Sequence, residues 1–500
     1  MALAVGQIVL GLVAPALFAA TPQIPPVSAT HGHYVVLGSV NGVTVANARL
    51  IIDAGYACPQ IEGGAAPIPM TSRDNPHLFP VIVCEAVVKF GRTLHITLQD
   101  RSLALPTVKT DPTRIVVFGD TGCKGYSAKS NTGCQPGTPA QPFASLAAAA
   151  AVGPTPDVVL HMGDYNYRGT SSHILFTVEQ EGKTTQVAEW TYDAGDGTGA
   201  AEGCEQGEGA TFWSQNAVNS NLPDTWAAWR DDFFRPARDL LAKAPWVLAR
   251  GNHELCSRAG PGWFYFLDPS SNLTGQQLSC PTPVASAGAL PNVVLPEPYA
   301  VDLGSLKLLV LDSANACDSF TDPTFNARYA KQFARLGAMA AGSETAWVMT
   351  HRPIWGVTGY SSTESTGCTS ANQWGCINQT LQAGLKEGLD GAFPPAVKLF
   401  LAGHMHRFQS VTFDDGRPPV VVVGTGGVAL DPSPPLGTVS VAVDGAKART
   451  LTTGADVTSS GSKLPAFGYL DITYSPDGTW SGTIHSPPEE LTLADCGSKQ

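Results

Sequence analysis

The chain has 500 residues, of which 43% are hydrophobic and 14% charged, so it is long enough for two domains or one large decorated domain. Its 30 basic and 42 acidic residues give a formal net charge of −12, which argues against the broad basic face that nucleic acids and anionic membranes require. A small anionic substrate remains compatible with this charge, because bound metal ions can reverse the local field.

The first segment, residues 1–20, is apolar and ends in small residues, which predicts a signal peptide cleaved between Ala16 and Ala20. The segment carries no Lys or Arg, and an uncleaved anchor is the competing interpretation, although the run is short for a membrane span. No other stretch is long and apolar enough to cross a bilayer, so we expect an exported protein without stable membrane insertion.

The cysteine count of 11 fits an exported protein with disulfides. Near pairs in the sequence are Cys58/Cys84, Cys123/Cys134 and Cys368/Cys376. Spacing alone does not establish the pairing, and the odd count leaves one thiol over.

Residues 32–110 show short alternating runs typical of strands, which predicts a small β-rich accessory domain followed by a linker. From 113 to 496 the pattern changes to apolar strands alternating with helical segments, which indicates an α/β catalytic domain with a parallel or mixed sheet. Within it, residues 168–222 are Gly-rich and polar, which predicts a long inserted loop.

The predicted strands of the catalytic domain are RIVVFGD, DVVLHMGD, PWVLARGNHE, LKLLVLDS, TAWVMTHRP, VKLFLAGHMH and PVVVVGTGG. The predicted helices cover residues 143–152, 226–242, 327–339 and 378–389, and residues 466–485 read as a strand pair.

Polar side chains follow five of these strands at the points where the strands end. They are Asp120, Asp164, the run Asn252-His253-Glu254, His351, and the pair His404 and His406. Ligand sites of open α/β sheets lie at the carboxyl ends of strands, so these groups are expected at one edge. Carboxylates together with imidazoles suit first-row divalent or trivalent metals, and so many donors suffice for two ions that share a carboxylate.

The motifs G-D-x-G (119–122), G-D-x-x-Y (163–167), G-N-H-E (251–254), V-x-x-H (348–351) and G-H-x-H (403–406) occur in this order. This series resembles the calcineurin-like metallophosphoesterase superfamily and, in detail, its purple acid phosphatase branch, in a bacterial-type member. The resemblance implies a four-layer αββα sandwich. The N-terminal β region is similar, more loosely, to the accessory domain of such enzymes.

The resemblance also implies the ligands of two metal ions. Iron(III) is expected at a tyrosine-bearing site made by Asp120, Asp164, Tyr167 and His406. A second site, for Fe(II), Zn(II) or Mn(II), is expected from Asp164, Asn252, His351 and His404, with Asp164 bridging. The superfamily commonly has a histidine ligand at the position where this chain has Gly122. The G-D-x-x-Y form of the second motif instead supplies a tyrosine ligand, which is Tyr167 in this chain.

Further residues are candidates for substrate contacts or for support of the ligands. The resemblance gives His253 a catalytic role, as a hydrogen-bond donor to the phosphate or as the acid that protonates the leaving alkoxide. Glu254 would orient His253 or support the ligands in another way. Arg352 and Arg250 are candidate phosphate clamps, with a structural salt bridge as the alternative for each. Tyr165 is a candidate for the pocket wall.

These features predict an exported binuclear hydrolase that cleaves small phosphate monoesters by attack of a metal-bound hydroxide. A phosphodiesterase or phospholipase acting with the same two metals is the main alternative. A non-catalytic surface binding protein is a further alternative, although every expected metal donor is present. The oligomeric state is not predicted.

Overall fold

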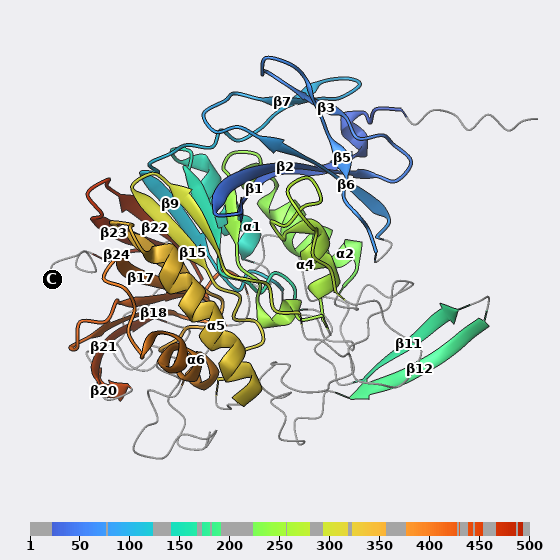
Figure 1. Cartoon of the computed structure of the whole chain (residues 1–500). Coiled ribbons are helices and arrows are strands. Elements are labelled where there is room, and N and C mark those ends of the chain that lie inside the picture. The colour runs from blue at the N-terminus through green and yellow to red at the C-terminus, as the bar shows by residue number, and fades with distance from the viewer. Residues whose placement is uncertain are drawn as a thin grey trace, which may run out of the picture.

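The computed structural model describes residues 23–76, 79–123, 142–167, 173–180, 183–191, 224–256, 258–280, 294–318, 323–356, 377–427, 430, 439–443, 446–453, 467–486 and 489–493. Two large sheets lie face to face, and helices cover their outer faces (Figure 1). The predicted four-layer αββα sandwich is confirmed.

The first sheet has ten strands, in the order β24-β23-β22-β9-β10-β13-β1-β2-β6-β5. In that order they span Glu489–Leu493, Trp480–Ser486, Tyr469–Tyr474, Arg114–Phe118, Val158–His161, Trp246–Leu248, Thr30–Val40, Val43–Asp53, Val81–Val88 and Thr71–Ser72. The central strands β9, β10 and β13 pair in parallel, so their carboxyl ends reach the same edge. The predicted strand pair at the C-terminus is formed by β22 and β23.

The second sheet has eight strands, in the order β14-β15-β16-β17-β19-β18-β21-β20. In that order they span Tyr299–Leu303, Leu306–Val310, Ala346–Met349, Val397–Ala402, Val420–Val423, Phe408–Phe413, Ala446–Thr453 and Val439–Val443. Here β15, β16, β17 and β19 are parallel neighbours, which again brings several carboxyl ends to one edge.

The hydrophobic core lies in three layers, because alternate residues of each buried strand point to opposite faces. Val117 and Leu160 of the first sheet pack against Trp347 and Leu399 of the second in the layer between the sheets. A second layer joins the other face of the first sheet to the helices α1 (Phe143–Val152), α2 (Trp226–Trp229), α3 (Arg235–Leu241) and α4 (Gly260–Phe266). A third joins the second sheet to α5 (Pro323–Ala340) and α6 (Gln379–Leu389).

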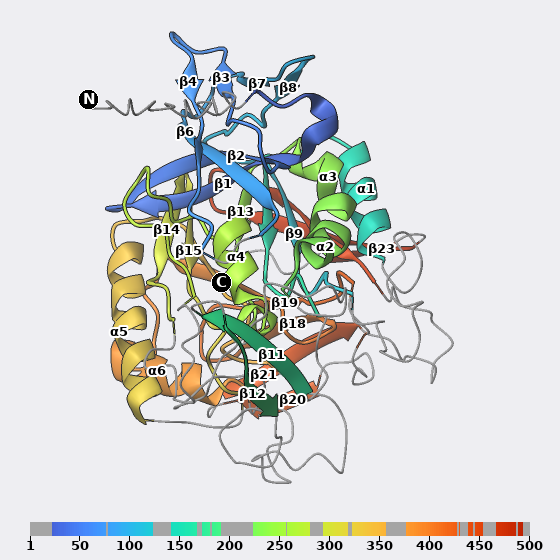
Figure 2. The same ribbon diagram turned by 90° about the vertical axis from the view of Figure 1, so that its right-hand side faces the viewer.

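The N-terminal β region is attached to the first sheet through shared strands. Strand β1 pairs in parallel with β13 at Val36 and Trp246, and β2, β6 and β5 extend the sheet further. A separate four-stranded sheet, with β4 (Ile68–Pro69), β3 (Gln60–Glu62), β7 (His95–Thr97) and β8 (Ser102–Ala104), lies beyond β2 and β6 at one end of the molecule (Figure 2). Part of the predicted accessory region therefore continues the catalytic sheet.

Two local predictions differ from the structure. The described part of the segment 168–222 contains a hairpin, β11 (His173–Gln180) and β12 (Lys183–Thr191), at the periphery of Figure 1, where we expected a loop. The predicted helix 226–242 is α2 and α3 joined by a π-helical segment, Arg230–Phe234. Short 3-10 helices span Val27–Ala29 and Asn252–Glu254.

Two disulfides join described cysteines. One joins Cys58 and Cys84, which are close together in the sequence, and the other joins Cys256 and Cys280, which were not among the near pairs noted above. Cys123 and Cys317 are also disulfide-bonded. Among the described residues, no helix has the length and apolar character needed to span a membrane.

Candidate metal centre

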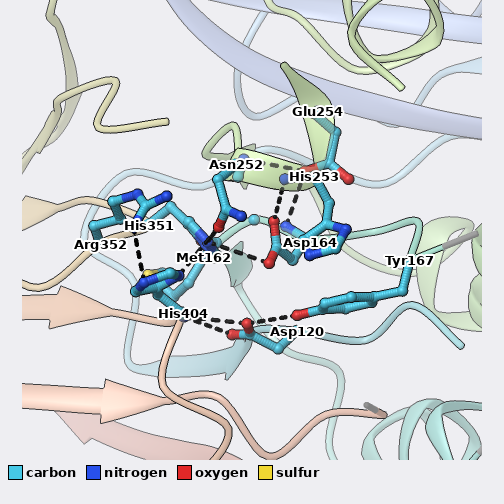
Figure 3. Close-up of polar contacts among 12 residues, drawn as sticks. Asp120, Met162, Asp164, Tyr167, Asn252, His253, Glu254, His351, Arg352 and His404 are labelled. Atoms are coloured by element: carbon cyan, nitrogen blue, oxygen red, sulfur yellow. Dashed lines mark hydrogen bonds and ion pairs between the residues drawn. The ribbon is translucent and has the colours of Figure 1, made fainter. Parts of the chain in front are cut away.

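The predicted donors converge at the carboxyl ends of parallel strands of both sheets (Figure 3). Three of them have left-handed backbones, with φ of 57° at Asp120, 59° at Asp164 and 70° at His404. Non-glycine residues rarely adopt this conformation, and such strain gathers at functional sites. The turns after β9, β10 and β17 thereby direct these side chains toward a common point.

The first group of donors contains the tyrosine. The Tyr167 hydroxyl donates a hydrogen bond to Asp120 Oδ1 at 2.8 Å and lies 3.1 Å from His406 Nε2. Ligand atoms of Asp120, Asp164 and His406 lie within 4.8 Å of one another, a spacing that a single metal ion can bridge. Tyr167 therefore faces the same point as these three residues.

The second group lies on the other side of Asp164. His351 Nε2 is 2.9 Å from Asn252 Oδ1 and 3.3 Å from Asp164 Oδ2, and His404 Nδ1 is 3.1 Å from Asn252 Oδ1. The ligand atoms of Asp164, His351 and His404 again lie within 4.8 Å of one another. Because Asp164 belongs to both groups, its carboxylate is placed to bridge two ions.

Burial and neighbouring charges set the protonation of the carboxylates. Burial raises the pKa of Asp120 to about 6, with His351 opposing the rise and Asp164 adding to it. Burial would also raise the pKa of Asp164, but the charge and hydrogen bond of His351, together with the hydrogen bond from the backbone N–H of His253, hold that pKa well below its usual range. Asp164 is therefore the better-ionised of the two carboxylates.

The packing around Gly122 leaves no room for a side chain at this position. A Cβ at this position would lie 2.7 Å from Asn166 N and from the carbonyl carbon and oxygen of Tyr165. The loop that carries Tyr167 therefore occupies the space of a residue-122 side chain. A glycine at residue 122 is therefore compatible with the position of the Tyr167 loop.

Glu254 supports the loop that carries Asp164 and Tyr167. Its Oε1 accepts from the backbone N–H groups of Tyr165 and Asn166, and its Oε2 from those of Asp164 and Gly251. Of the two roles predicted for Glu254, the described hydrogen bonds favour support of the ligand loop over orientation of the His253 ring.

His253 lies beside both donor groups and is partly exposed. Its backbone N–H donates to Asp164 Oδ1 at 2.9 Å, and its ring centre lies 4.1 Å from that of Tyr167. Burial lowers the pKa of His253 well below its usual value. A substrate bound across the two groups would lie within reach of this ring.

Two of the further candidates lie elsewhere. Arg250 is buried and donates to Asp312, with Nε–Oδ2 at 2.8 Å, so the salt-bridge alternative holds and the phosphate-clamp role does not fit this geometry. Tyr165 is fully buried, stacks on His161 with centroids 4.0 Å apart and donates to Ala249 O. Its side chain therefore belongs to the core of the first sheet and its helices, and this burial does not support the pocket-wall role.

Arg352 is fully buried at the back of the second group. Its Nη1 donates to Asp318 Oδ2 at 2.8 Å and lies 2.9 Å from His404 Nε2. This position favours a structural ion pair over direct contact with a phosphate.

Sequence reasoning missed Asp318 and Ser313. Asp318 contacts His404, and the Ser313 hydroxyl accepts from the backbone N–H groups of His351 and Arg352. Both follow strand β15, whose carboxyl end lies at the same edge as those of its neighbours. Ligand sites of open α/β sheets lie at the carboxyl ends of strands, and this rule could have identified the segment although it contains none of the motifs.

Comparison with known proteins agrees with this arrangement. The calcineurin-like phosphoesterase family matches residues 113–408, more than half of the chain. None of the curated proteins matches the sequence significantly. A solved structure, GAP50, the anchor in the inner membrane complex of Plasmodium, is 13% identical over 76% of this chain and 87% of its own, with a TM-score of 0.34, which is too low to support any inference.

Proposed function

This chain belongs to the calcineurin-like phosphoesterase family, and from that premise we propose that it is an exported phosphatase that hydrolyses small phosphate monoesters with two metal ions. The observation that carries the proposal is the pair of donor groups that share Asp164. Membership of the family indicates metal-dependent hydrolysis of phosphoesters. The preference for monoesters and the export of the protein are our proposals.

The donors fit two different ions. The first group offers carboxylate and phenol oxygens with one imidazole, which favours a hard ion such as iron(III). The second offers Asp164, the Asn252 amide oxygen, His351 and His404, which suits Fe(II), Zn(II) or Mn(II). When bound by these residues, two such ions would supply a water-derived nucleophile at neutral pH and would neutralise charge on the phosphoryl oxygens.

The chain's own groups would orient the substrate and move protons. His253 is the candidate that either donates a hydrogen bond to a phosphoryl oxygen or protonates the leaving alkoxide. The carboxylate of Glu254 holds the amides of residues 164–166, which keeps Asp164 and Tyr167 in place. Preorganisation of this kind lowers the cost of aligning the reacting groups.

We further infer that the chain belongs to the purple acid phosphatase branch. The inference rests on Tyr167 within the first group and on the loop packing that excludes a side chain at Gly122. Export is supported by the disulfides Cys58–Cys84 and Cys256–Cys280, which form in oxidising compartments.

The test is a visible absorption spectrum of the purified protein, with iron quantified on the same sample. We expect a broad band that disappears in Tyr167→Phe and remains in Tyr165→Phe. Tyr165 is the matched control because it is an equally buried phenol two positions away whose hydroxyl donates to Ala249 O. A colourless protein that contains iron would contradict the role of Tyr167.

Assays with a mono-ester and a bis-ester of the same chromogenic phenol test the substrate preference. A higher kcat/KM for the mono-ester supports the proposal. A higher value for the bis-ester would overturn the monoesterase proposal and favour a phosphodiesterase with the same metal centre. Loss of both activities on treatment with a chelator, with recovery when metal is added, would establish that the hydrolysis depends on metal.

A further inference from the structure

The carboxylate of Asp318 is the meeting point of three donors behind the second group. Its Oδ2 lies 2.7 Å from His404 Nε2 and accepts from Arg352 Nη1 at 2.8 Å. Its Oδ1 accepts from Asn378 Nδ2 at 2.9 Å. Both oxygens therefore have partners, and the carboxylate is held in one orientation.

These contacts determine which nitrogen of His404 faces the metal centre. Nδ1 of His404 lies 3.1 Å from Asn252 Oδ1, on the side where His351 Nε2 also points. Nε2 of His404 lies 2.7 Å from Asp318 Oδ2 and 2.9 Å from Arg352 Nη1. The carboxylate accepts hydrogen bonds from both groups, so we assign the hydrogen of the ring to Nε2 and the lone pair that faces the centre to Nδ1. His351 is held in a comparable way, because its Nδ1 lies 2.7 Å from the Met162 carbonyl oxygen.

The two histidines differ in the charge of the group behind them. His351 has a neutral carbonyl as partner, whereas His404 has a carboxylate. A carboxylate that accepts from a ligating imidazole fixes the tautomer and raises the basicity of the other nitrogen. Asp318 therefore strengthens His404 as a ligand as well as orienting it.

The partners of Asp318 are themselves rigidly placed. Arg352 and Asn378 have buried side chains. Asn378 is also the N-cap of α6, where its Oδ1 accepts from Leu381 N, and its Nδ2 donates to Ala316 O at 3.2 Å. The N-terminal end of α6 and the segment after β15 therefore both fix the position of the Asp318 carboxylate.

We propose that Asp318 is a positioning residue that acts through His404 to hold the second metal ion. The proposal rests on the two-metal function proposed above. It assigns a role to a residue that belongs to none of the family's motifs in this sequence. It also gives Arg352 the role of anchoring Asp318.

The experiment compares Asp318→Asn, His404→Ala and the double variant by calorimetric titration of the chelator-treated full chain with Zn²⁺. The site that His404→Ala removes is the second site. We expect Asp318→Asn to weaken that site about 10- to 100-fold and to leave the other site unchanged. The double variant should lose no more affinity than His404→Ala, because the two residues act as one unit.

Asp471→Asn is the matched control. Asp471 pairs with Arg114 at 2.6 Å with 15% of its side chain exposed, against 2.8 Å and 20% for Asp318 with Arg352. This control removes a similar ion pair from the same fold without contact to any metal donor. Equal urea unfolding of the chelated Asp318 and Asp471 variants would establish that the loss of affinity is not general destabilisation.

Three outcomes would overturn the proposal. They are unchanged Zn²⁺ affinity in Asp318→Asn, equal weakening of both sites, and further loss of Zn²⁺ binding at the other site in the double variant. Failure of the proposed function is a different result, because the wild-type chain would then bind fewer than two ions or show no hydrolysis of phosphate esters.

Discussion

Replacing Gly122 with alanine tests the packing that separates this chain from relatives with a histidine at that position. The added methyl group would lie 2.7 Å from three backbone atoms of Tyr165 and Asn166, closer than real Cβ contacts come. Overpacking of this kind costs about 1–3 kcal/mol. Alanine also restricts the unfolded chain, which returns about 0.4–1 kcal/mol. The expected net loss is about 1–2 kcal/mol in the free energy of unfolding.

Because the contacted atoms are backbone, relief of the clash must separate residue 122 from the loop that carries Tyr167. We therefore expect Gly122→Ala also to lengthen the Tyr167–Asp120 contact and to weaken metal binding at the first group. The measurements are urea unfolding of the chelated protein and the intensity of the visible band after reloading with iron.

Gly275→Ala is the control, since Gly275 has nothing within 4 Å of its Cβ position and no left-handed φ. This variant should match the wild type or gain a few tenths of a kcal/mol. If Gly122→Ala unfolds like Gly275→Ala and keeps the full band, the steric account of Gly122 is refuted.

Three further predictions concern buried acids and the proposed catalytic histidine. Burial raises the pKa of Asp224 from 3.8 to about 7, against the hydrogen bonds from Trp229 and Gly262 that lower it. The folded chain therefore holds this proton more tightly than the unfolded chain. The contribution of Asp224 to the free energy of unfolding is full below pH 3.8 and is lost, by about 4 kcal/mol, as the pH rises from there through 7. Asp224→Asn should remove this part of the pH dependence. The measurement is the free energy of unfolding of variant and wild type, from urea unfolding at several pH values. Glu254→Gln should cost about 2–5 kcal/mol in urea unfolding, because its amide leaves two backbone N–H donors without an acceptor; a loss below 1 kcal/mol would contradict this role. His253→Ala should lower kcat by about 10²- to 10⁴-fold with both metal ions retained by elemental analysis, and unchanged kcat would remove His253 from the mechanism.

The sequence predicted the architecture well where a local pattern carries it. The helix predicted over 143–152 has the same bounds in the structure, because an unbroken apolar and alanine-rich run is bounded by Pro142 and Gly153. The parallel strands were recognised because both faces are buried and their sequences are continuously apolar. The convergence of the strand-end polar residues followed from the geometry of parallel sheets.

Contacts between distant segments were not predictable in the same way. Arg250 pairs with a residue 62 positions away and His404 with one 86 positions away, and neither partner belongs to a motif. Strand β1 joins the first sheet next to β13, a neighbour that its own alternation does not specify. In each case the local sequence determines the element, whereas tertiary packing selects the neighbour.

The supporting groups explain how the two proposed metal sites can differ in their donors. Motif residues supply the donors, but Met162 O and Asp318 select the metal-facing nitrogens of His351 and His404. The first group contains the Tyr167 oxygen instead of a second imidazole, and the packing of its loop on Gly122 keeps that oxygen there. The difference between the two sites therefore originates in backbone packing and in residues behind the ligands. It follows that exchanging Gly122 for histidine would displace Tyr167 without creating the site found in other members of the family.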